Sequence, residues 1–350
     1  MTERAGWGIL GTGGIAHTFA NALGESRLGR LVAVGSRDAA RSKAFATEFG
    51  LERSRGSYQA LVDDPEVEFV YVATPHTMHV ELAVLAAEAG KHVLCEKPVA
   101  VNAAGAVTIF EAARKAGVFL MEGFAFRVHP QVAHLVRLLE GGEIGELRSI
   151  HASFGFDAGP APTNYLMRHD LAGGAMLDNG CYPVALSRRI AGHTVGQVFR
   201  NPDRVFGAGL LHPTERIDLD ATALTWYEGG VSATLACTLR TEVDKTVVIT
   251  GSKGFIRLPA AFLPGRMDRF GGTPRIILER HGEAPQEQLV ETPPGLYNVE
   301  ADAVVAHARE GRTEAPEMTW EDSLGNMTVL DRWRAAVGVT YDVPGEGTAQ

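Results

Sequence analysis

From Gly6 to Gly123 the chain alternates short apolar runs with helical stretches that end in glycine. This alternation is typical of a parallel sheet, because consecutive parallel strands need a crossover connection, usually a helix. The runs are almost continuously apolar, as strands that are covered on both faces must be. They lie at Trp7–Leu10, Leu31–Ser36, Glu68–Ala73, His92–Glu96 and Val118–Glu122. We therefore predict a right-handed, doubly wound α/β sheet.

The helices between these runs have recognisable ends. Asp38 can cap a helix that ends at Gly50. Asn102 can cap another that ends at Gly117. Both pairs follow the usual preference for a short polar residue before a helix and a glycine after it.

The pattern changes after Gly123. It predicts a helix from Pro130 to Leu139 and then an alternating strand, with one solvated face, from Arg148 to Phe156. Two hairpins follow, TALTWY with VSATLACTL and TVVITG with GFIRL. Two helices, near 298–309 and 321–337, come last. This half indicates an α+β domain with a large, mostly antiparallel open sheet.

The segment GILGTGGIA, from Gly8 to Ala16, predicts a strand, a glycine turn and a helix. Residues without Cβ atoms at Gly11, Gly13 and Gly14 let backbone N–H groups approach a pyrophosphate. We expect a dinucleotide here, although such turns also occur for packing alone. The predicted domains are a dinucleotide-binding domain (1–123), a second domain (124–340) and a tail (341–350).

Composition argues against several classes of protein. The net charge of −9 and the lack of a basic stripe argue against a nucleic-acid surface. No apolar run approaches the ~20 residues that cross a bilayer, and MTERAG lacks a signal-peptide pattern, so we expect a cytoplasmic protein. Cys95, Cys181 and Cys237 are far apart and form no CxxC. We therefore expect neither a disulfide framework nor a metal site.

The fourth apolar run leads into Cys95-Glu96-Lys97-Pro98. Lys97 thus follows the carboxyl end of a central strand, where open α/β sheets bind their ligands. The proline favours an extended conformation at Lys97, which can then project its ammonium group into the crevice. The alternative is an ordinary surface lysine.

A second chemical motif is GGAMLDNGCY, from Gly173 to Tyr182. Asp178 and Tyr182 are four residues apart, which puts a carboxylate and a phenol on one face of a helix. The alternative is a helix that follows glycines, with a capping aspartate and a half-buried tyrosine.

Taken together, these motifs resemble those of the Gfo/Idh/MocA family, the glucose-fructose oxidoreductase and inositol dehydrogenase-like oxidoreductases. The resemblance covers nearly the whole chain. It includes the glycine turn, the loop ATPHTMH at Ala73–His79, the CEKP motif and GGAMLDNGCY. It implies that residues 1–123 are a dinucleotide-binding Rossmann domain and residues 124–340 a substrate-binding and oligomerisation domain, whose open sheet forms a homodimer or homotetramer. The implied cofactor-binding residues are Gly11, Thr12, Gly13, Gly14, Ile15, Ser36, Arg37, Thr74, Pro75, His76, His79, Glu96 and Lys97.

The same resemblance implies that Lys97 is the catalytic lysine and Asp178 a substrate-binding or catalytic carboxylate. Many members carry histidine where this chain has Tyr182, and asparagine where it has His76. The tyrosine form is similar to the branch with dihydrodiol dehydrogenases, in which the tyrosine transfers a proton. Alcohol oxidation needs such a group, because a hydroxyl proton leaves while hydride departs from carbon.

The second predicted strand ends in Gly35-Ser36-Arg37, with no acid where NAD-selective folds place one on the ribose. A hydroxyl beside a guanidinium group suits a 2′-phosphate, so NADP is expected and NAD remains possible. Asp38 is the competing ribose ligand, but its position favours a helix cap.

Further substrate contacts are expected near the second motif. Asn164 and Arg168 lie in the loop from Ala158 to Arg168, just before that helix. Arg127 and His129 either reach the substrate or cofactor or brace the turn between the domains.

The sequence therefore predicts an NADP-dependent oxidoreductase that acts on a secondary alcohol, or the corresponding carbonyl, of a sugar, cyclic polyol or dihydrodiol. The predicted catalytic residues are Lys97, Tyr182 and Asp178, and the predicted substrate-binding residues add Arg127, Asn164 and Arg168. Two alternatives stay open: a glycoside hydrolase or lyase of the same fold that oxidises its substrate transiently, and a non-catalytic protein that senses the cofactor.

Overall fold

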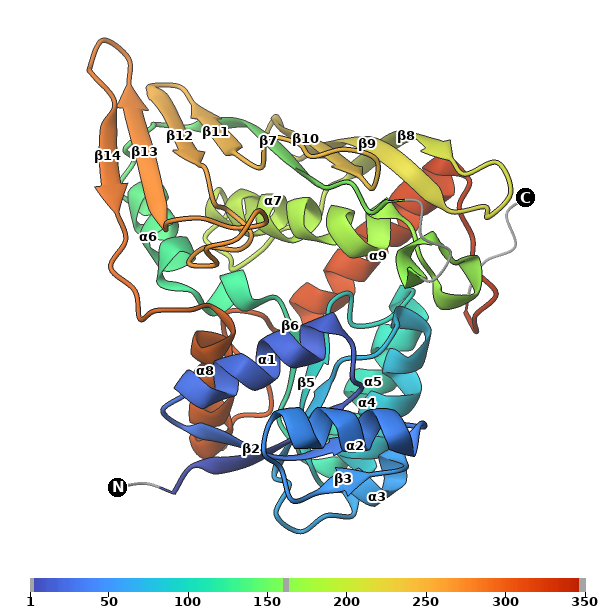
Figure 1. The fold of residues 1–350 in the computed structure, drawn as a ribbon. Helices are drawn as coiled ribbons and strands as arrows, with labels where there is room; N and C mark the ends of the chain where they lie inside the picture. Colours follow the sequence, from blue (N-terminus) through green and yellow to red (C-terminus); the bar gives the residue numbers. More distant parts are fainter. Residues whose placement is uncertain (1–2, 160–163, 346–350) are drawn as a thin grey trace. The chain divides into compact units, whose positions relative to one another are not determined.

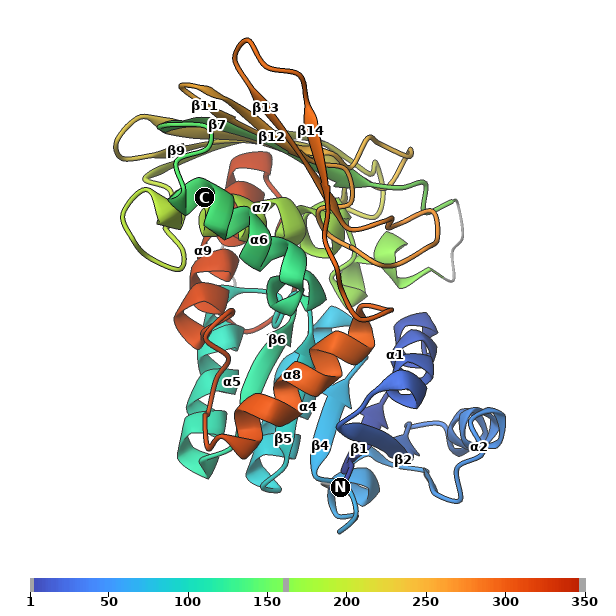
Figure 2. The ribbon, with the colours of Figure 1, turned by 90° about the vertical axis from the view of Figure 1, so that its left-hand side faces the viewer.

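The computed structural model describes residues 3–159 and 164–345 (Figures 1 and 2). The chain divides into two compact units. The first comprises residues 1–100, 104–128 and 295–323, and the second comprises residues 101–103, 129–294 and 324–350. The predicted α/β class, with a parallel sheet and a separate, mostly antiparallel one, is confirmed.

The first unit contains a six-stranded parallel sheet in the order β3-β2-β1-β4-β5-β6. Its strands are β1 (Ala5–Leu10), β2 (Gly29–Gly35), β3 (Ser54–Arg55), β4 (Phe69–Val72), β5 (His92–Glu96) and β6 (Leu120–Gly123). Its helices are α1 (Gly14–Glu25), α2 (Ala39–Glu48), α3 (Tyr58–Val62), α4 (His79–Glu88), α5 (Ala103–Ala116) and α8 (Tyr297–Arg309). The five predicted strands are confirmed. The sixth, β3, has two residues and was not predicted, since so short a segment has no period.

The predicted helix ends agree with the structure. The Asp38 side chain accepts hydrogen bonds from the N–H groups of Ala40 and Arg41, so it caps α2. Gly50, with φ of 64°, follows that helix. Helix α5 begins directly after Asn102 and is followed by Gly117, with φ of 67°.

Aromatic rings fill the core between α1 and the sheet. Trp7 packs on Phe19 with ring centroids 5.2 Å apart, and Phe19 stacks on Tyr71 at 3.9 Å. Helix α8 lies beside α1 in both views (Figures 1 and 2). Asp302 of α8 accepts hydrogen bonds from the Ser26 hydroxyl and the Leu28 N–H group. The carboxyl end of α1 is thereby fixed by a segment about 275 residues later in the chain.

The second unit contains an eight-stranded sheet in the order β14-β13-β12-β11-β7-β10-β9-β8. Its strands are β7 (Leu147–Gly155), β8 (Arg204–Leu211), β9 (Asp218–Tyr227), β10 (Val231–Thr238), β11 (Val247–Gly251), β12 (Gly254–Leu258), β13 (Arg275–Arg280) and β14 (Gln286–Leu289). Every pair is antiparallel except β7 with β10. Both predicted hairpins, β9–β10 and β11–β12, are confirmed.

Helices α6 (Pro130–Glu140) and α7 (Cys181–His193) lie on one face of this sheet (Figures 1 and 2). Helix α9 (Trp320–Val337) joins the second unit from Leu324 onward. The other face carries exposed apolar side chains on the paired strands β8 and β9. They are Phe206 (55% exposed), Leu210 (48%), Leu224 (38%) and Trp226 (42%), and we call them the outer apolar patch. Within the described ranges, no helix is both long and apolar enough to cross a membrane.

Candidate active site

The glycine turn lies at the carboxyl end of β1, one of the two middle strands of the parallel sheet. Gly11 has φ of 115°, and a Cβ atom there would come within 2.5 Å of the Ala73 carbonyl oxygen, so the position requires glycine. Gly13 and Gly14 are different, because a Cβ atom on either would meet no atom within 4 Å. Their lack of side chains leaves open space in front of α1.

The backbone N–H groups at the amino end of α1 can bind an anion. Gly13 occupies the N-cap position, and no side chain within residues 3–159 and 164–345 caps the helix. The first N–H groups of a helix have no partner within it and carry partial positive charge. Thr12 and Ile15 border the same turn and are half-buried. This arrangement fits a pyrophosphate, as the sequence predicts.

The loop after β4 supplies a second part of the same sheet edge. The Thr74 hydroxyl is buried and has no hydrogen-bond partner within the described chain. A buried polar atom of this kind needs a partner, which a bound ligand can provide. Pro75 and the buried His76 follow in the chain.

His79, at the start of α4, is fully buried and holds two loops of this edge together. Its Nδ1 atom lies 2.8 Å from the Pro98 carbonyl oxygen, and its Nε2 atom lies 2.9 Å from the Thr74 carbonyl oxygen. Burial lowers the pKa of His79 despite these contacts. A neutral imidazole has one N–H group and so donates to only one of the two carbonyls at a time.

Lys97 follows β5, two strands away from β1 in the sheet. The side chain is half-buried, while the preceding Glu96 is buried. Glu96 accepts a hydrogen bond from the Tyr71 hydroxyl and another, at 3.2 Å, from the Lys97 N–H group. The carboxylate thus fixes the backbone that carries the lysine. Nearby, burial and the charge of Glu96 raise the pKa of the Glu300 carboxyl well above its usual value.

Ser36 and Arg37 follow β2 at the outer part of the edge. The Ser36 hydroxyl accepts a hydrogen bond from the Asp38 N–H group at 3.2 Å and still has a proton to donate. Arg37 is exposed. Because the Asp38 carboxylate accepts two N–H groups of α2, the predicted helix cap is confirmed.

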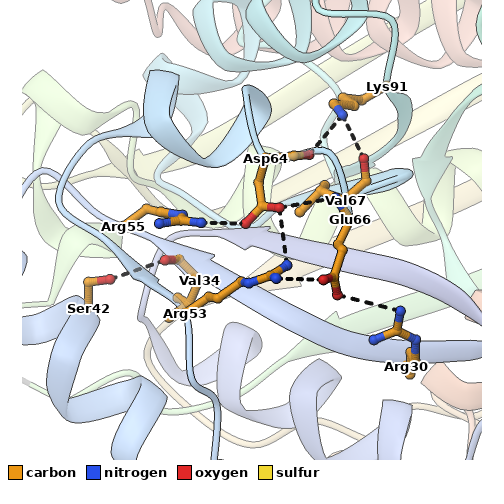
Figure 3. A network of polar contacts seen from close by, with 9 residues as sticks. All are labelled: Arg30, Val34, Ser42, Arg53, Arg55, Asp64, Glu66, Val67 and Lys91. Atoms are coloured by element: carbon orange, nitrogen blue, oxygen red, sulfur yellow. Dashed lines mark hydrogen bonds and ion pairs between the residues drawn. The ribbon is translucent and has the colours of Figure 1, made fainter.

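The short strand β3 holds this turn from the other side. Gly35 pairs with Arg55, and the Arg55 carbonyl oxygen accepts a hydrogen bond from Ser36 N–H at 3.2 Å. Figure 3 shows the ion network behind β3, in which Arg53 and Arg55 both contact the buried carboxylate of Asp64. The Arg55 contact is 2.7 Å long.

The network has further members around Asp64 (Figure 3). Glu66 pairs with Arg53, and Lys91 donates to the Asp64 and Val67 carbonyl oxygens at 3.0 and 2.7 Å. Burial disfavours the Asp64 carboxylate, but the hydrogen bond from Arg55 and the other contacts outweigh it and lower the pKa of Asp64. The network therefore stabilises the strand that supports the Ser36 turn.

In the second unit, Asp178 and Tyr182 lie at the start of one helical segment. Asp178 belongs to a π-helical turn, η5 (Met176–Gly180), and Tyr182 to the first turn of α7. Isolated π-helical turns occur often at functional sites. Both side chains are largely buried, at 6% and 7% exposure. The predicted carboxylate and phenol therefore lie four residues apart on one helical segment, and both are largely buried.

The paired glycines before this segment each fit against a neighbour. A Cβ atom on Gly173 would lie 2.3 Å from the Leu166 carbonyl oxygen. A Cβ atom on Gly174, with φ of 117°, would lie 2.3 Å from the Asp218 Oδ1 atom. Asn179 donates to the Thr238 carbonyl oxygen of β10 at 3.0 Å, which ties the π-helical turn to the sheet.

Aromatic rings surround the phenol of Tyr182. Phe154 of β7 meets it edge to face with ring centroids 5.0 Å apart, and Phe262 lies 5.7 Å away. A second phenol, which the sequence analysis did not select, lies beside Asp178: the Tyr165 hydroxyl donates to its Oδ1 atom at 3.5 Å. Tyr165 lies in the predicted substrate loop. Its position in that loop could have marked it as a candidate substrate contact, but its contact with Asp178 has no pattern in the sequence.

The other predicted substrate residues have defined local roles. Asn164 accepts a hydrogen bond from Leu166 N–H and begins the short helix η3 (Tyr165–Met167). Arg168 is exposed and pairs with Asp170. Residues 160–163 of the predicted loop 158–168, and residues 346–350 of the predicted tail 341–350, lie outside the described residues.

Arg127 and His129 are both buried. The Arg127 guanidinium group lies 2.6 Å from the Asp322 carboxylate in a fully buried ion pair, and it also donates to the Glu317 carbonyl oxygen. His129 caps α6 by accepting a hydrogen bond from Gln131 N–H, and burial lowers the pKa of its imidazole to about 4.

The structure thus groups the predicted residues into two sets. The glycine turn, the Ser36 turn, the Thr74 loop and Lys97 all follow the carboxyl ends of neighbouring parallel strands in the first unit. Asp178 and Tyr182 share one helical segment of the second unit. In the described ranges, no group of three or more His, Cys, Asp or Glu side chains could hold a metal ion.

Comparison with protein families gives two matches. Residues 5–124 match the oxidoreductase family with an NAD-binding Rossmann fold, and residues 132–257 match the GFO/IDH/MocA C-terminal domain. Among curated proteins, the chain is 34% identical over 345 residues to trans-1,2-dihydrobenzene-1,2-diol dehydrogenase of Mus musculus. That alignment covers 96% of this chain and 97% of the mouse enzyme.

Two solved structures are similar over the same length. A 3-ketoreductase of Actinomadura kijaniata, in complex with NADP and TDP-benzene, is 28% identical with a TM-score of 0.83 and covers 96% of this chain and 98% of its own. The aldose-aldose oxidoreductase of Caulobacter crescentus is 23% identical with a TM-score of 0.84, again over 96% of this chain and 98% of its own. The latter likeness concerns the fold.

Proposed function

Because the chain belongs to the Gfo/Idh/MocA family of NAD(P)-dependent oxidoreductases, we propose that it transfers a hydride between NADP and a secondary alcohol or its carbonyl. The substrate class is a sugar, a cyclic polyol or a dihydrodiol. The observation that carries the proposal furthest is that Asp178 and Tyr182 lie, largely buried, at the start of one helical segment. Lys97 follows β5 at the edge of the sheet where the cofactor is expected to bind. The nicotinamide supplies the hydride chemistry when bound.

In this proposal Tyr182 and Lys97 hold and move the proton of the reacting hydroxyl group. Free tyrosine and lysine have pKa values of about 10 and 10.4, so an ammonium group near the phenol would favour proton release from it. The aromatic rings of Phe154 and Phe262 exclude water around the Tyr182 side chain. Asp178 accepts a hydrogen bond from a substrate hydroxyl group and orients it.

We also propose a preference for NADP over NAD. The Asp38 carboxylate accepts two N–H groups of α2, which leaves it less able to bind a ribose hydroxyl group. The Ser36 hydroxyl and the exposed Arg37 next to it suit a 2′-phosphate. The ketoreductase of Actinomadura kijaniata, which is similar over most of the chain, binds NADP.

The substrate class is supported by the relatives. The mouse enzyme is named as a dehydrogenase of a dihydrobenzene diol, and the bacterial ketoreductase is named for reduction of a 3-keto group. Both names refer to chemistry at a carbon that carries oxygen, and the name of the mouse enzyme places it on a ring. The aromatic and carboxylate groups near Tyr182 suit a ring with hydroxyl groups, since rings stack on aromatic faces and hydroxyl groups donate to a carboxylate.

We further propose a homodimer or homotetramer in which a second copy covers the outer apolar patch. Four large apolar side chains between 38% and 55% exposed lie together on two paired strands. Contiguous exposed apolar surface of this kind is typical of an interface.

The experiment is a substrate screen read by NADPH absorbance. The purified protein is mixed with NADP⁺ and a panel of sugars, polyols and dihydrodiols, and with NADPH and the matching carbonyl compounds. We expect net formation or consumption of NADPH with at least one ring substrate. Product formation without net NADPH change would instead identify the transient-oxidation alternative. Cofactor binding without any turnover would support a sensor.

A further inference from the structure

A buried carboxylate, Asp218, lies at the amino end of the helical segment that carries Asp178 and Tyr182. Asp218 begins β9 and is fully buried. Its Oδ2 atom accepts a hydrogen bond from Met176 N–H at 2.6 Å, and Met176 is the first residue of the π-helical turn. Its Oδ1 atom is buried and has no hydrogen-bond partner among the residues that the structure describes. The carboxylate thus binds the amino end of the segment directly.

The turn before the segment is shaped around this carboxylate. Oδ1 lies so close to Gly174 that any Cβ atom there would come within 2.3 Å of it. Tyr341 provides a second contact on the same turn, because its hydroxyl donates to the Gly173 carbonyl oxygen. These two contacts and the Leu166 carbonyl oxygen, which accepts from Gly174 N–H at 2.9 Å, fix the backbone just ahead of Met176.

We propose that Asp218 is a positioning residue, whose buried carboxylate holds the start of this segment so that Asp178 and Tyr182 keep the geometry that proton transfer requires. The inference rests on the proposed function, because it assigns a task to the segment only if those two side chains act on the substrate. Asp218 itself touches no reacting atom in this proposal.

The charge on Asp218 is costly for the fold. Burial raises the pKa of Asp218 to about 6, although the Met176 N–H group and the charge of Arg334 oppose this rise. The titratable groups that face it are the Arg334 guanidinium group of α9, the Tyr341 phenol and the Cys237 thiol of β10. Burial also raises the pKa of Cys237 well above its usual value, so this thiol carries no charge near neutral pH.

The raised pKa has a definite sign for stability. Between the unfolded pKa of 3.8 and the folded pKa of about 6, the folded protein binds a proton that the unfolded chain has lost. Stability from this group therefore falls as pH rises through that window. A buried carboxylate that weakens the fold at neutral pH, yet binds the start of the functional segment, suggests a task other than stability.

The test compares Asp218→Asn with wild type. Asn keeps the shape but removes the charge, so the helix start is held less firmly. We expect kcat at pH 7.5 to fall about 10-fold to 100-fold, the effect of a small misplacement of reacting groups. The affinity for NADPH should change less than about twofold, since Asp218 binds the start of the helical segment at Met176 and not the glycine turn or the Ser36 turn. Below pH 6, where wild-type Asp218 is protonated, the two proteins should converge, so the acid limb of kcat near pH 6 should disappear in the variant.

Thermal unfolding gives a readout that needs no activity. The melting temperature of Asp218→Asn, relative to wild type, should rise from pH 5 to pH 7, because only wild type loses stability on ionisation of this group. Asp220→Asn is the matched control. Asp220 lies two residues along the same strand and bonds to Thr238 and Arg240, not to the helix start. It should change neither the acid limb nor the slope of melting temperature against pH.

Tyr341→Phe provides an independent arm if Asp218→Asn does not fold. It removes the contact to the Gly173 carbonyl oxygen and leaves the carboxylate intact, so kcat should fall while the acid limb near pH 6 remains. Wild-type kcat with an unchanged acid limb in Asp218→Asn, or wild-type kcat in Tyr341→Phe, would overturn the inference. An inactive wild-type protein across the substrate panel would instead refute the proposed function.

Discussion

Lys97 and Tyr182 have different surroundings, and this difference bears on how each would work. Lys97 is half-buried on a backbone that Glu96 fixes, whereas the Tyr182 phenol is largely buried among aromatic rings. In the proposed function both groups serve proton transfer, while the glycine turn and the Ser36 turn bind the cofactor. Chemistry and cofactor binding should therefore respond separately to substitution.

Lys97→Met and Tyr182→Phe remove the proton-transferring groups with little change in bulk. Each should lower kcat by ~100-fold or more, as expected for a lost general acid or base. Because the two groups would serve the same proton-transfer step, the double variant should have a kcat only slightly lower than that of the less active single variant. The measurements are steady-state kinetics and NADPH binding by fluorescence, and binding should change little.

Tyr227→Phe is the control for the tyrosine. Tyr227 is buried in the same unit and donates to the Ser187 hydroxyl at 3.3 Å, so the variant loses the same atom farther along α7, beyond Tyr182. It should keep wild-type kcat. If Tyr182→Phe did so too, Tyr182 would be a packing residue and the assignment to the tyrosine branch would fail.

Arg37→Ala tests the cofactor preference. Loss of one charge-assisted phosphate contact should weaken NADPH binding by about 1.5–3 kcal/mol and leave NADH binding nearly unchanged. Titration with both cofactors gives the two dissociation constants. Lys43→Ala, which removes an exposed cation from α2, is the control and should alter neither. Equal or tighter NADH binding by the wild-type protein would refute the preference.

Among single residues, roles that depend on neighbours in the chain could be predicted from the sequence, whereas long-range contacts could not. Asp38 could be predicted as a cap because caps depend on the next few residues, and the two hydrogen bonds agree. Asp218 could not be predicted, because its partner Met176 lies 42 residues away and its own strand gives no sign of that contact. Tyr165 was missed for the same reason, since its proximity to Asp178 depends on the fold of a loop.

At the scale of elements, long segments with a clear period were predicted well. The predicted strand His92–Glu96 has the bounds of β5, and the predicted helix Pro130–Leu139 differs from α6 by one residue. β3 was not predicted, and neither were β8, β13 and β14. These strands are short, carry charged residues or, in β8, contain two glycines, so partners rather than their own pattern determine them.

The short strand β3 leads to a prediction about stability. Asp64 keeps a lowered pKa because Arg55 and other contacts outweigh its burial, so it stabilises the fold above the unfolded pKa of 3.8. That contribution is lost as pH falls through the lower folded value. Asp64→Asn should therefore destabilise the protein by about 1–3 kcal/mol at pH 7, and the difference from wild type should shrink below about pH 4. Denaturant unfolding at several pH values measures it.

Glu66→Gln serves as the control within the same network. Its side chain is 45% exposed and pairs with Arg53 and Arg30, so its removal should have a much smaller effect. An equal loss in both variants would show that Asp64 has no special role in the support of β3.

At the scale of the whole molecule, the outer apolar patch predicts self-association. Leu224→Glu places a charge in the middle of the patch, next to Phe206 on the paired strand. It should convert the assembly to the 37.5 kDa monomer or weaken it strongly, because an unpaired charge in an apolar interface is costly. Sedimentation velocity at micromolar concentration measures this.

Leu289→Glu is the matched control, since Leu289 is 67% exposed but lies on β14 at the opposite edge of the sheet. It should leave the assembly intact. A wild-type protein that sediments only as a monomer would refute the proposed dimer or tetramer.

The return of residues 295–323 to the first unit has a consequence for biosynthesis. Asp302 anchors the end of α1, so the ribosome must deliver more than four-fifths of the chain before that anchor exists. The strands of the parallel sheet are synthesised early. The side of α1 that α8 covers stays exposed until the entire second sheet has been translated. A message truncated after the second sheet would thus yield a chain whose earliest-made half is still incomplete, and such a chain is a natural client for chaperones and proteases.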